Sequence, residues 1–280
     1  MSCFDNRFFD SHCHFDFVEF NADRAALWRA CNAEGITQLL IPGVTPDQWQ
    51  TAAQLCVQYA GLCYAAGIHP HWIVQQPWFP TDTNNLLDKS VREKITALIL
   101  QEFNLSTNVC AARCVAVGES GLDKMIATPF DLQQELLTIH IDVARQIHKP
   151  LIVHCVRAHN EMIALLKKHK PVAGGVIHAF SGSYEVAQQY VDLGFYLGIG
   201  GTITYERAQK TRAAAAKIPL EFLVLETDAP DMPLHGSQGQ RNSPEYLPQI
   251  AQVLADLHDV AVDEIAAVTY RNTMRLFHRS

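Results

Sequence analysis

Histidines in this 280-residue chain follow short apolar runs at several places, and the first case is a closely spaced pair. The run Arg7–Ser11 is predicted to be a buried strand, and His12 and His14 come directly after it. Side chains alternate between the two faces of a strand, so we expect both imidazoles on one face and Cys13 on the other. Neutral imidazole is the commonest protein ligand for zinc and similar ions. The pair predicts part of a metal site, although such a pair also occurs by chance.

The elements that carry these residues alternate between strands and helices. Eight strands are expected at Arg7–Ser11, Ile36–Ile41, Cys63–Ile68, Cys114–Gly118, Pro150–Val153, Gly174–Ile177, Phe195–Ile199 and Phe222–Leu225. Helices are expected after them, at 22–33, 45–59, 86–101, 129–148, 160–169, 184–192, 205–216, 244–258 and 262–277. This alternation implies parallel strands, and eight such units predict an α/β protein with a (β/α)8 TIM barrel. An open doubly wound sheet is the alternative, but no glycine-rich nucleotide fingerprint follows the first strand.

Active sites of such barrels lie at the C-terminal ends of the strands. The sequence places six residues of metal-ligand type there, namely His12, His14, Glu119, His154, His178 and Asp228. Each has an ordinary structural interpretation by itself, such as a buried core histidine or a turn residue. Six donors exceed what one tetrahedral zinc needs, so we expect two divalent ions bridged by a carboxylate, with Glu119 as the bridge. Two ions suit phosphodiester hydrolysis, and Asp228 is the candidate general base because it could take the proton of an activated water.

Several other residues near the predicted strand ends are candidates for contact with a substrate. Arg157 follows His154 by three residues, and a guanidinium matches phosphate oxygens in a bidentate manner. The remaining candidates for substrate contact are His69, Tyr205 and Arg241. Histidines on predicted helices are expected instead to be solvated or to cap a helix, and these are His140, His148, His169, His258 and His278.

Composition limits the class of protein. The net charge is −7, from 22 basic and 29 acidic residues, so contact with a polyanion must be local and metal-assisted. Eight cysteines occur without C-x-x-C pairs, which favours buried free thiols in a reducing compartment over a disulfide framework. No window approaches 18 apolar residues, and no signal peptide is recognised at the start. We expect a cytoplasmic protein with one domain over residues 1–280, no membrane contact and no obligate protein partner.

An ordered set of short motifs resembles the TatD family of metal-dependent deoxyribonucleases, within the wider amidohydrolase-like barrels. The resemblance covers nearly the whole chain and is carried by Asp10–His14, Gly67–Pro70, Val117–Asp123, His154–Arg157, His178–Gly182 and Glu226–Pro230. The stretches Asp231–Leu234 and Gly200–Tyr205 are most similar to the YjjV-like branch. Two positions depart from the family pattern, Ser120 and Lys124, and neither is a predicted ligand.

The resemblance implies the same six ligands and a metal-dependent hydrolysis of nucleic-acid phosphodiester bonds. Members are described as 3′→5′ exonucleases on single-stranded DNA or RNA, so strand ends are the expected substrate. The ions remain open among Zn, Mn, Mg, Ni and Co, because histidine and carboxylate ligands discriminate little between them. A metal-dependent hydrolase of another ester or an amide, such as a D-aminoacyl-tRNA deacylase, is the alternative. A non-catalytic metal-binding scaffold is a third class, but it would require a missing ligand or base.

Overall fold

The computed structural model describes residues 7–79, 87–104 and 113–277, and its eight strands follow chain order in one sheet. Each strand is followed by at least one helix before the next strand or the end of the described chain. The predicted (β/α)8 fold class is confirmed. Internal contacts divide the chain into two compact units, Met1–Ile41 with His178–Ser280, and Pro42–Ile177. A single domain over residues 1–280 stays a prediction.

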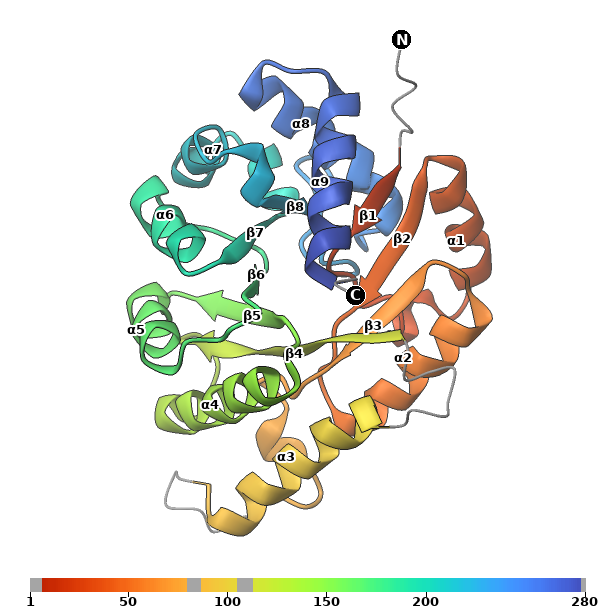
Figure 1. Ribbon diagram of the computed structural model, residues 1–280. Helices are drawn as coiled ribbons and strands as arrows, with labels where there is room; N and C mark the ends of the chain where they lie inside the picture. Colours follow the sequence, from red (N-terminus) through yellow and green to blue (C-terminus); the bar gives the residue numbers. More distant parts are fainter. Residues whose placement is uncertain (1–6, 80–86, 105–112, 278–280) are drawn as a thin grey trace. The chain divides into compact units, whose positions relative to one another are not determined.

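The first unit combines both ends of the chain. Its elements are β1 (Phe8–Asp10), η1 (Val18–Phe20), α1 (Arg24–Ala33), β2 (Ile36–Ile41), α6 (Tyr184–Asp192), β7 (Phe195–Ile199), η4 (Gly201–Thr204), α7 (Gln209–Ala215), η5 (Leu220–Phe222), β8 (Leu223–Leu225), η6 (Pro244–Tyr246), α8 (Leu247–His258) and α9 (Val262–Phe277). Strand β1 pairs in parallel with β2, and β7 pairs in parallel with β8. Helix α9 packs against β1 and β8 (Figure 1). Phe9 of β1 contributes to this packing, since its ring centroid lies 6.3 Å from those of Tyr270 and Phe277.

The second unit is the middle of the chain. Its elements are α2 (Pro46–Gln58), β3 (Leu62–Ala66), η2 (Ile73–Gln75), α3 (Lys89–Asn104), β4 (Cys114–Asp123), α4 (Phe130–Ile147), β5 (Leu151–Val156), α5 (His159–His169) and β6 (Gly175–Ile177). The strands pair in parallel, with Gly121 of β4 opposite His154 of β5. Helix α2 begins as its sequence predicts: Pro46 opens it, and the Thr45 hydroxyl accepts a hydrogen bond from the Gln48 N–H at 3.3 Å.

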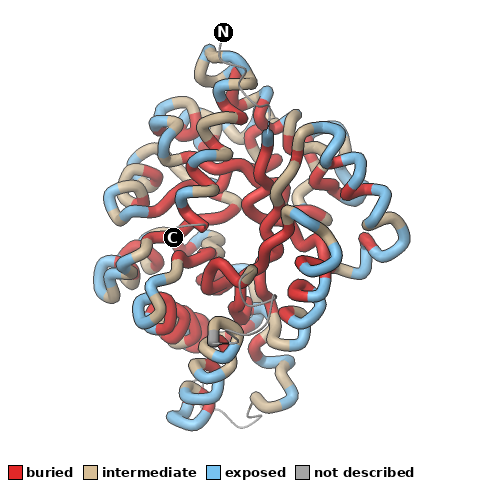
Figure 2. Tube along the Cα trace, turned by 45° about the vertical axis from the view of Figure 1, so that its right-hand side comes forward, coloured by how far each residue is buried: buried red, intermediate tan, exposed pale blue. Residues whose placement is uncertain are grey.

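Burial explains why the strand sequences are continuous runs of mostly apolar residues. All five residues of β3 and all ten residues of β4 are buried. Figure 2 shows buried residues along the strand segments, while exposed residues gather on helices and connecting loops. Strands of a parallel sheet are covered on both faces, so their side chains do not alternate between apolar and polar. The polar residues inside β4 are therefore exceptions that require partners.

Several predicted boundaries differ from the structure. Strands β4 and β5 extend through Glu119 and His154, which were expected just beyond the strand ends. Strand β1 ends at Asp10, so His12 and His14 lie on a loop and their placement does not follow from strand alternation. Helix α7 begins at Gln209 rather than 205, because residues 205–208 after η4 form a turn instead of the first helical turn. The connection between the predicted strand at Cys63–Ile68 and the next predicted helix contains η2, and residues 80–86 lie outside the described residues.

The cysteine and membrane expectations concern the described residues only. The free thiols there are Cys13, Cys31, Cys56, Cys63, Cys114 and Cys155, of which all but Cys155 are buried. Burial raises the pKa of the Cys31 thiol to about 12, so it stays protonated near neutral pH. Cys3 and Cys110 lie outside the described residues. Within the described chain, no helix is long and apolar enough to cross a membrane.

Candidate metal-binding clusters

The four predicted ligands of the first unit lie together, and we call them the loop cluster: His12, His14, His178 and Asp228. Asp228 Oδ1 lies 3.4 Å from His12 Nε2 and 3.7 Å from His14 Nε2. The rings of His12 and His178 are stacked, with centroids 4.0 Å apart and an interplanar angle of 10°. The three histidines are buried, and Asp228 reaches the edge with a side chain 13% exposed. All four come from segments beyond strand ends.

Glu226 joins this cluster and was missed in the sequence analysis. Its side chain is fully buried, and Oε1 accepts a hydrogen bond from the Ala179 N–H. The same oxygen lies 3.9 Å from His178 Nδ1. One donor atom each from His12, His178 and Glu226 forms a group whose members all lie within 4.8 Å of one another. The available signal was position, since Glu226 directly follows β8 just as His178 follows β6.

A buried carboxylate connects the loops that carry the loop cluster. Asp10 Oδ1 accepts from the backbone N–H groups of His12 at 3.2 Å and Thr227 at 3.0 Å. Asp10 Oδ2 accepts from the Thr227 hydroxyl at 2.6 Å. Backbone hydrogen bonds continue this connection, from Asp228 N–H to His12 O at 2.9 Å and from His14 N–H to Ala229 O at 2.8 Å. The relative placement of His12 and Asp228 thus depends on a charge-assisted network.

Further side chains hold the loops on either side of this network. Arg24 donates to the carbonyl oxygens of Phe15 at 2.8 Å and Phe17 at 2.9 Å, which fixes the loop after β1. The side-chain amide of Asn242 donates to the carbonyl oxygens of Thr227 and Asp231, both at 2.8 Å. Neither Arg24 nor Asn242 was singled out from the sequence. Each side chain donates hydrogen bonds to backbone carbonyl oxygens of a loop, where no helix or sheet supplies these bonds.

The electrostatics of the loop cluster are dominated by burial. Burial raises the pKa of Glu226 to about 8, although His178 opposes the shift. Burial also raises the pKa of Asp10 to about 7, against the hydrogen bonds from Thr227 and His12. Asp228 raises both values further by like-charge repulsion. Burial and mutual repulsion thus disfavour the charged forms of these carboxyl groups, and a bound cation would offset that cost.

The second unit holds the other two predicted ligands in what we call the strand cluster: Glu119, His154, His69 and Asp123. His154 Nδ1 lies 3.0 Å from Glu119 Oε1, and His154 Nε2 lies 3.3 Å from Asp123 Oδ2. Glu119 and Asp123 belong to β4, and His154 belongs to the adjacent β5. Burial alone would raise the Asp123 pKa, but hydrogen bonds from His154 and the Met125 N–H outweigh it and lower that pKa.

His69 lies beside the carboxylate of this cluster. Its Nδ1 accepts from the His71 N–H at 3.1 Å, so a neutral His69 carries its proton on Nε2. That Nε2 lies 3.4 Å from Glu119 Oε1. The expected substrate contact His69 is thus placed where it can orient Glu119. Asp123, in contrast, was not singled out as a functional residue, and its contact with His154 could not be read from chain spacing.

His140 of α4 supports the segment that carries His69. It is fully buried, so the expectation of a solvated or capping histidine is wrong at this position. Its Nε2 accepts from the Ile68 N–H at 2.9 Å, while Nδ1 faces the Leu136 carbonyl oxygen at 2.7 Å. Both contacts require a neutral ring with its proton on Nδ1. Burial correspondingly lowers the His140 pKa to about 4.

The other three candidates for substrate contact have different surroundings. Arg157 is exposed and adopts a left-handed conformation at φ 53°, just beyond β5. The Tyr205 hydroxyl donates to the Pro233 carbonyl oxygen at 2.7 Å. Arg241 is paired with both carboxylate oxygens of Asp23, at 3.0 and 2.6 Å. Arg241 therefore holds the β8–α8 loop to the start of α1, and binding a phosphate would require breaking this pair.

Both clusters suit a divalent cation by the chemistry of their donors. If His154 donates its Nε2 proton to Asp123, the Nδ1 lone pair faces an oxygen of Glu119 at 3.0 Å, and a shared cation removes that repulsion. In the loop cluster, Glu226 Oε2 is buried with no hydrogen-bond partner among the described residues. An unsatisfied buried carboxylate oxygen is costly unless a cation or donor reaches it. The residues present therefore fit a metal.

Comparison with known proteins places the chain among metal-dependent hydrolases. A family model described as TatD related DNase matches residues 9–278. A relative from Escherichia coli K12, named as an uncharacterized metal-dependent hydrolase, YjjV, is 39% identical over 97% of this chain and 98% of its own. A relative from Klebsiella pneumoniae, named 3′-5′ ssDNA/RNA exonuclease TatD, is 30% identical over 96% of this chain and 97% of its own.

A solved structure agrees with these sequence matches. The crystal structure of YjjV, described as a TatD homologue from Escherichia coli K12, superposes with a TM-score of 0.86. The two chains are 37% identical in this superposition, which covers 99% of this chain and 100% of the other. The fold and the sequence motifs thus point to the same family.

Proposed function

Because the chain belongs to the TatD related DNase family, we propose that it is a divalent-metal-dependent hydrolase that removes nucleotides from the ends of single-stranded DNA or RNA. The observation that carries this proposal is the set of histidine nitrogens and carboxylate oxygens gathered in the two clusters. The name of the Klebsiella pneumoniae relative supports the choice of a phosphodiester substrate and of a 3′→5′ direction.

We assign the ligands by cluster. His12, His14, His178 and Asp228 would hold one ion, and Glu119 with His154 would hold the second. A divalent ion supplies a Lewis acid that activates water and neutralises charge developing on a phosphoryl group. Zn, Mn, Mg, Ni and Co are all candidates for these ions. A bridging role for Glu119 stays a prediction.

The protein's own groups would then move and hold protons. Asp228 is the general base in this proposal, because its carboxylate is partly exposed and adjoins His12 and His14. The exposed edge lets the proton it accepts pass on to solvent. Glu119, in contrast, is 2% exposed and is contacted by His69, so it suits charge stabilisation and ligation. Arg157, exposed beyond β5, is available to pair with a substrate phosphate.

The direct test is release of nucleotides from 3′-labelled single-stranded DNA by purified protein reconstituted with Mn²⁺ or Zn²⁺, with and without EDTA. Metal-dependent trimming by the wild type is the expected result. Absence of trimming by protein that demonstrably binds metal would contradict the substrate assignment. Ester and amide substrates, including a D-aminoacyl-tRNA, should be assayed in parallel, since hydrolysis of one of these alone would replace the phosphodiester proposal.

A further inference from the structure

A small pocket of the first unit is formed by the loops after β7 and β8. It has a volume of about 180 Å³ and is lined by Tyr205, Glu206, Arg207, His235 and Gln238. The two loops touch elsewhere as well, since a Cβ on Gly201 would meet the Met232 carbonyl oxygen at 2.9 Å. Both loops leave the C-terminal ends of their strands, which is the side where (β/α)8 enzymes bind substrates.

Hydrogen bonds fix the walls of this pocket. The Tyr205 hydroxyl donates across the two loops to the Pro233 carbonyl oxygen at 2.7 Å. The His235 N–H donates back to the Thr204 hydroxyl at 2.9 Å. Gln238 Oε1 accepts from the Gly236 N–H at 3.0 Å, which leaves the amide NH2 of Gln238 as a donor. The pocket is therefore largely formed before any ligand arrives.

Its rings are arranged to receive a flat ligand. The rings of Tyr205 and His235 are nearly perpendicular, at 84°, with centroids 5.5 Å apart. A planar group that stacks on one of them meets the other edge-on, and both geometries are favourable for aromatic pairs. The Arg207 guanidinium lies 4.9 Å from the Tyr205 ring centroid and adds a second planar surface.

The polar groups select a base rather than a bare phosphate. Glu206 contributes a carboxylate, which accepts hydrogen bonds and repels a phosphate. Arg207 contributes only donors, and both side chains are exposed. The edges of a nucleobase present donors and acceptors together, so they match this mixture. Guanine fits best, because its N–H groups can pair with a carboxylate while O6 and N7 accept from a guanidinium.

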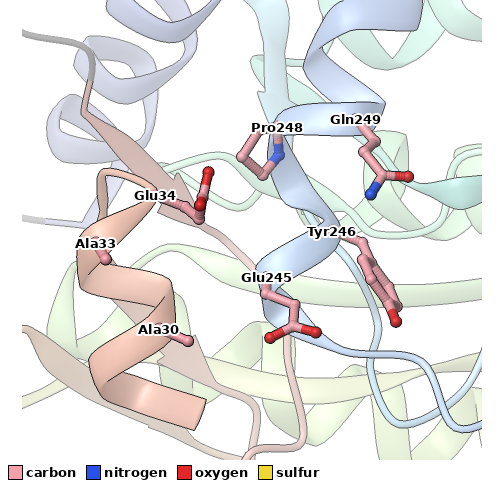
Figure 3. Close-up of a pocket in the computed structure, with 7 residues that line it drawn as sticks. All are labelled: Ala30, Ala33, Glu34, Glu245, Tyr246, Pro248 and Gln249. Atoms are coloured by element: carbon pink, nitrogen blue, oxygen red, sulfur yellow. The ribbon is translucent and has the colours of Figure 1, made fainter.

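A larger pocket in the same unit lacks these features. It has a volume of about 460 Å³ between α1 and the start of α8. Figure 3 shows two carboxylates at it, from Glu34 just after α1 and from Glu245 of η6. No lysine or arginine is among its lining residues, so a polyanion would meet only like charge there. It serves as a matched control surface.

We propose that the pocket at Tyr205, Glu206 and Arg207 is a nucleobase subsite that prefers guanine. It would hold one base of a strand whose phosphodiester bond is presented to the metal clusters, and in this respect it rests on the proposed function. The two loops would thus give the enzyme a base preference within the nucleic-acid strand. None of the residues that line the pocket is a proposed metal ligand.

Binding without turnover tests the subsite. The probes are 5′-fluorescein-labelled dT ten-mers, unmodified or with a single dG at each position in turn, measured by fluorescence anisotropy in EDTA. We expect dG at one position to tighten binding about fivefold or more, within the discrimination typical of a good base contact. Glu206→Gln should abolish this preference, whereas Glu245→Gln in the larger pocket should retain it.

Two results would overturn the subsite. Equal binding of all ten-mers by the wild type would do so, and so would an unchanged dG preference in Glu206→Gln. Trimming of the unmodified dT ten-mer by metal-loaded wild type reports the proposed function separately. Trimming without any dG preference would remove the subsite alone, while the absence of both trimming and strand binding would remove the function and the subsite together.

Discussion

The loop cluster and the strand cluster offer similar donors, but the chain positions them in different ways. In the strand cluster, Glu119 and His154 are members of adjacent paired strands, so their neighbourhood follows from the register of β4 with β5. In the loop cluster, His12 and Asp228 lie beyond short strands and are held by the Asp10–Thr227 hydrogen bonds. Backbone regularity fixes the first arrangement, and a buried polar network fixes the second. The loop cluster should therefore respond more strongly to the loss of a single polar partner.

The largest effect is expected at the loop cluster itself. Asp228→Asn removes the proposed base and one ligand oxygen charge, so hydrolysis should fall by about 10²- to 10⁴-fold. The fold should persist, because the Asp228 backbone bond to His12 does not need the carboxylate. Single-turnover rates with matched metal loading measure the effect. Wild-type rates in this variant would remove the general-base role.

The next effect concerns the support of the strand cluster by His140. The folded pKa of about 4 lies below the ordinary 6.5, so the unfolded chain binds a proton that the folded chain does not. Stability contributed by the neutral ring is complete above pH 6.5 and is lost as pH falls toward 4, by about 3 kcal/mol. Urea unfolding between pH 7 and 4 measures this loss.

A matched pair of variants isolates the His140 contribution from other titrating groups. His140→Gln keeps a donor and an acceptor in place, so its stability should vary less with pH than that of the wild type over the same range. His71→Gln, at an exposed position, should vary as the wild type does. An identical pH dependence in all three proteins would contradict the account.

How far the sequence predicts these features depends on the range of the contacts involved. The eight strands and six ligand candidates could be found because apolar runs and their polar ends are local signals. Glu226 and Asp123 were missed because their significance lies in contacts with His178 and His154, which no local spacing specifies. For His140 the sequence does contain a signal, because His140 lies at helical spacing between Leu136 and Ala144, both buried.

Removing a partner carboxylate from each cluster tests the comparison directly. Asp10→Asn replaces an acceptor of three hydrogen bonds, so metal affinity of the loop cluster should fall about 10- to 100-fold. Unfolding stability should also fall, by about 1–3 kcal/mol. Asp123→Asn loosens His154 and should lower metal affinity while costing less stability, since β4 and β5 still pair. Isothermal titration with the metal ion measures the affinity of both variants, and urea unfolding measures their stability. Equal stability losses would refute the distinction between the clusters.

The smallest effect is expected at the exposed candidate for phosphate contact. Arg157→Ala should raise KM for a single-stranded oligonucleotide about 3- to 10-fold, because one exposed phosphate contact is lost. Metal content should not change, since the Arg157 side chain is exposed just beyond β5 and is not one of the proposed ligands. Arg24→Ala provides a contrast, because loss of its loop contacts should affect stability as well. An unaltered KM would remove Arg157 from the substrate-binding residues.

The central claim is that each cluster holds its own divalent ion, and the most direct measurement is metal content by mass spectrometry. Purified protein would be reconstituted with Mn²⁺ or Zn²⁺ and freed of excess metal. About two ions per chain are expected in the wild type, as in two-metal hydrolases. Less bound metal than in the wild type is expected in two double variants, His12→Ala with His178→Ala and Glu119→Ala with His154→Ala. Wild-type metal content in either double variant, in a folded protein, would contradict the claim.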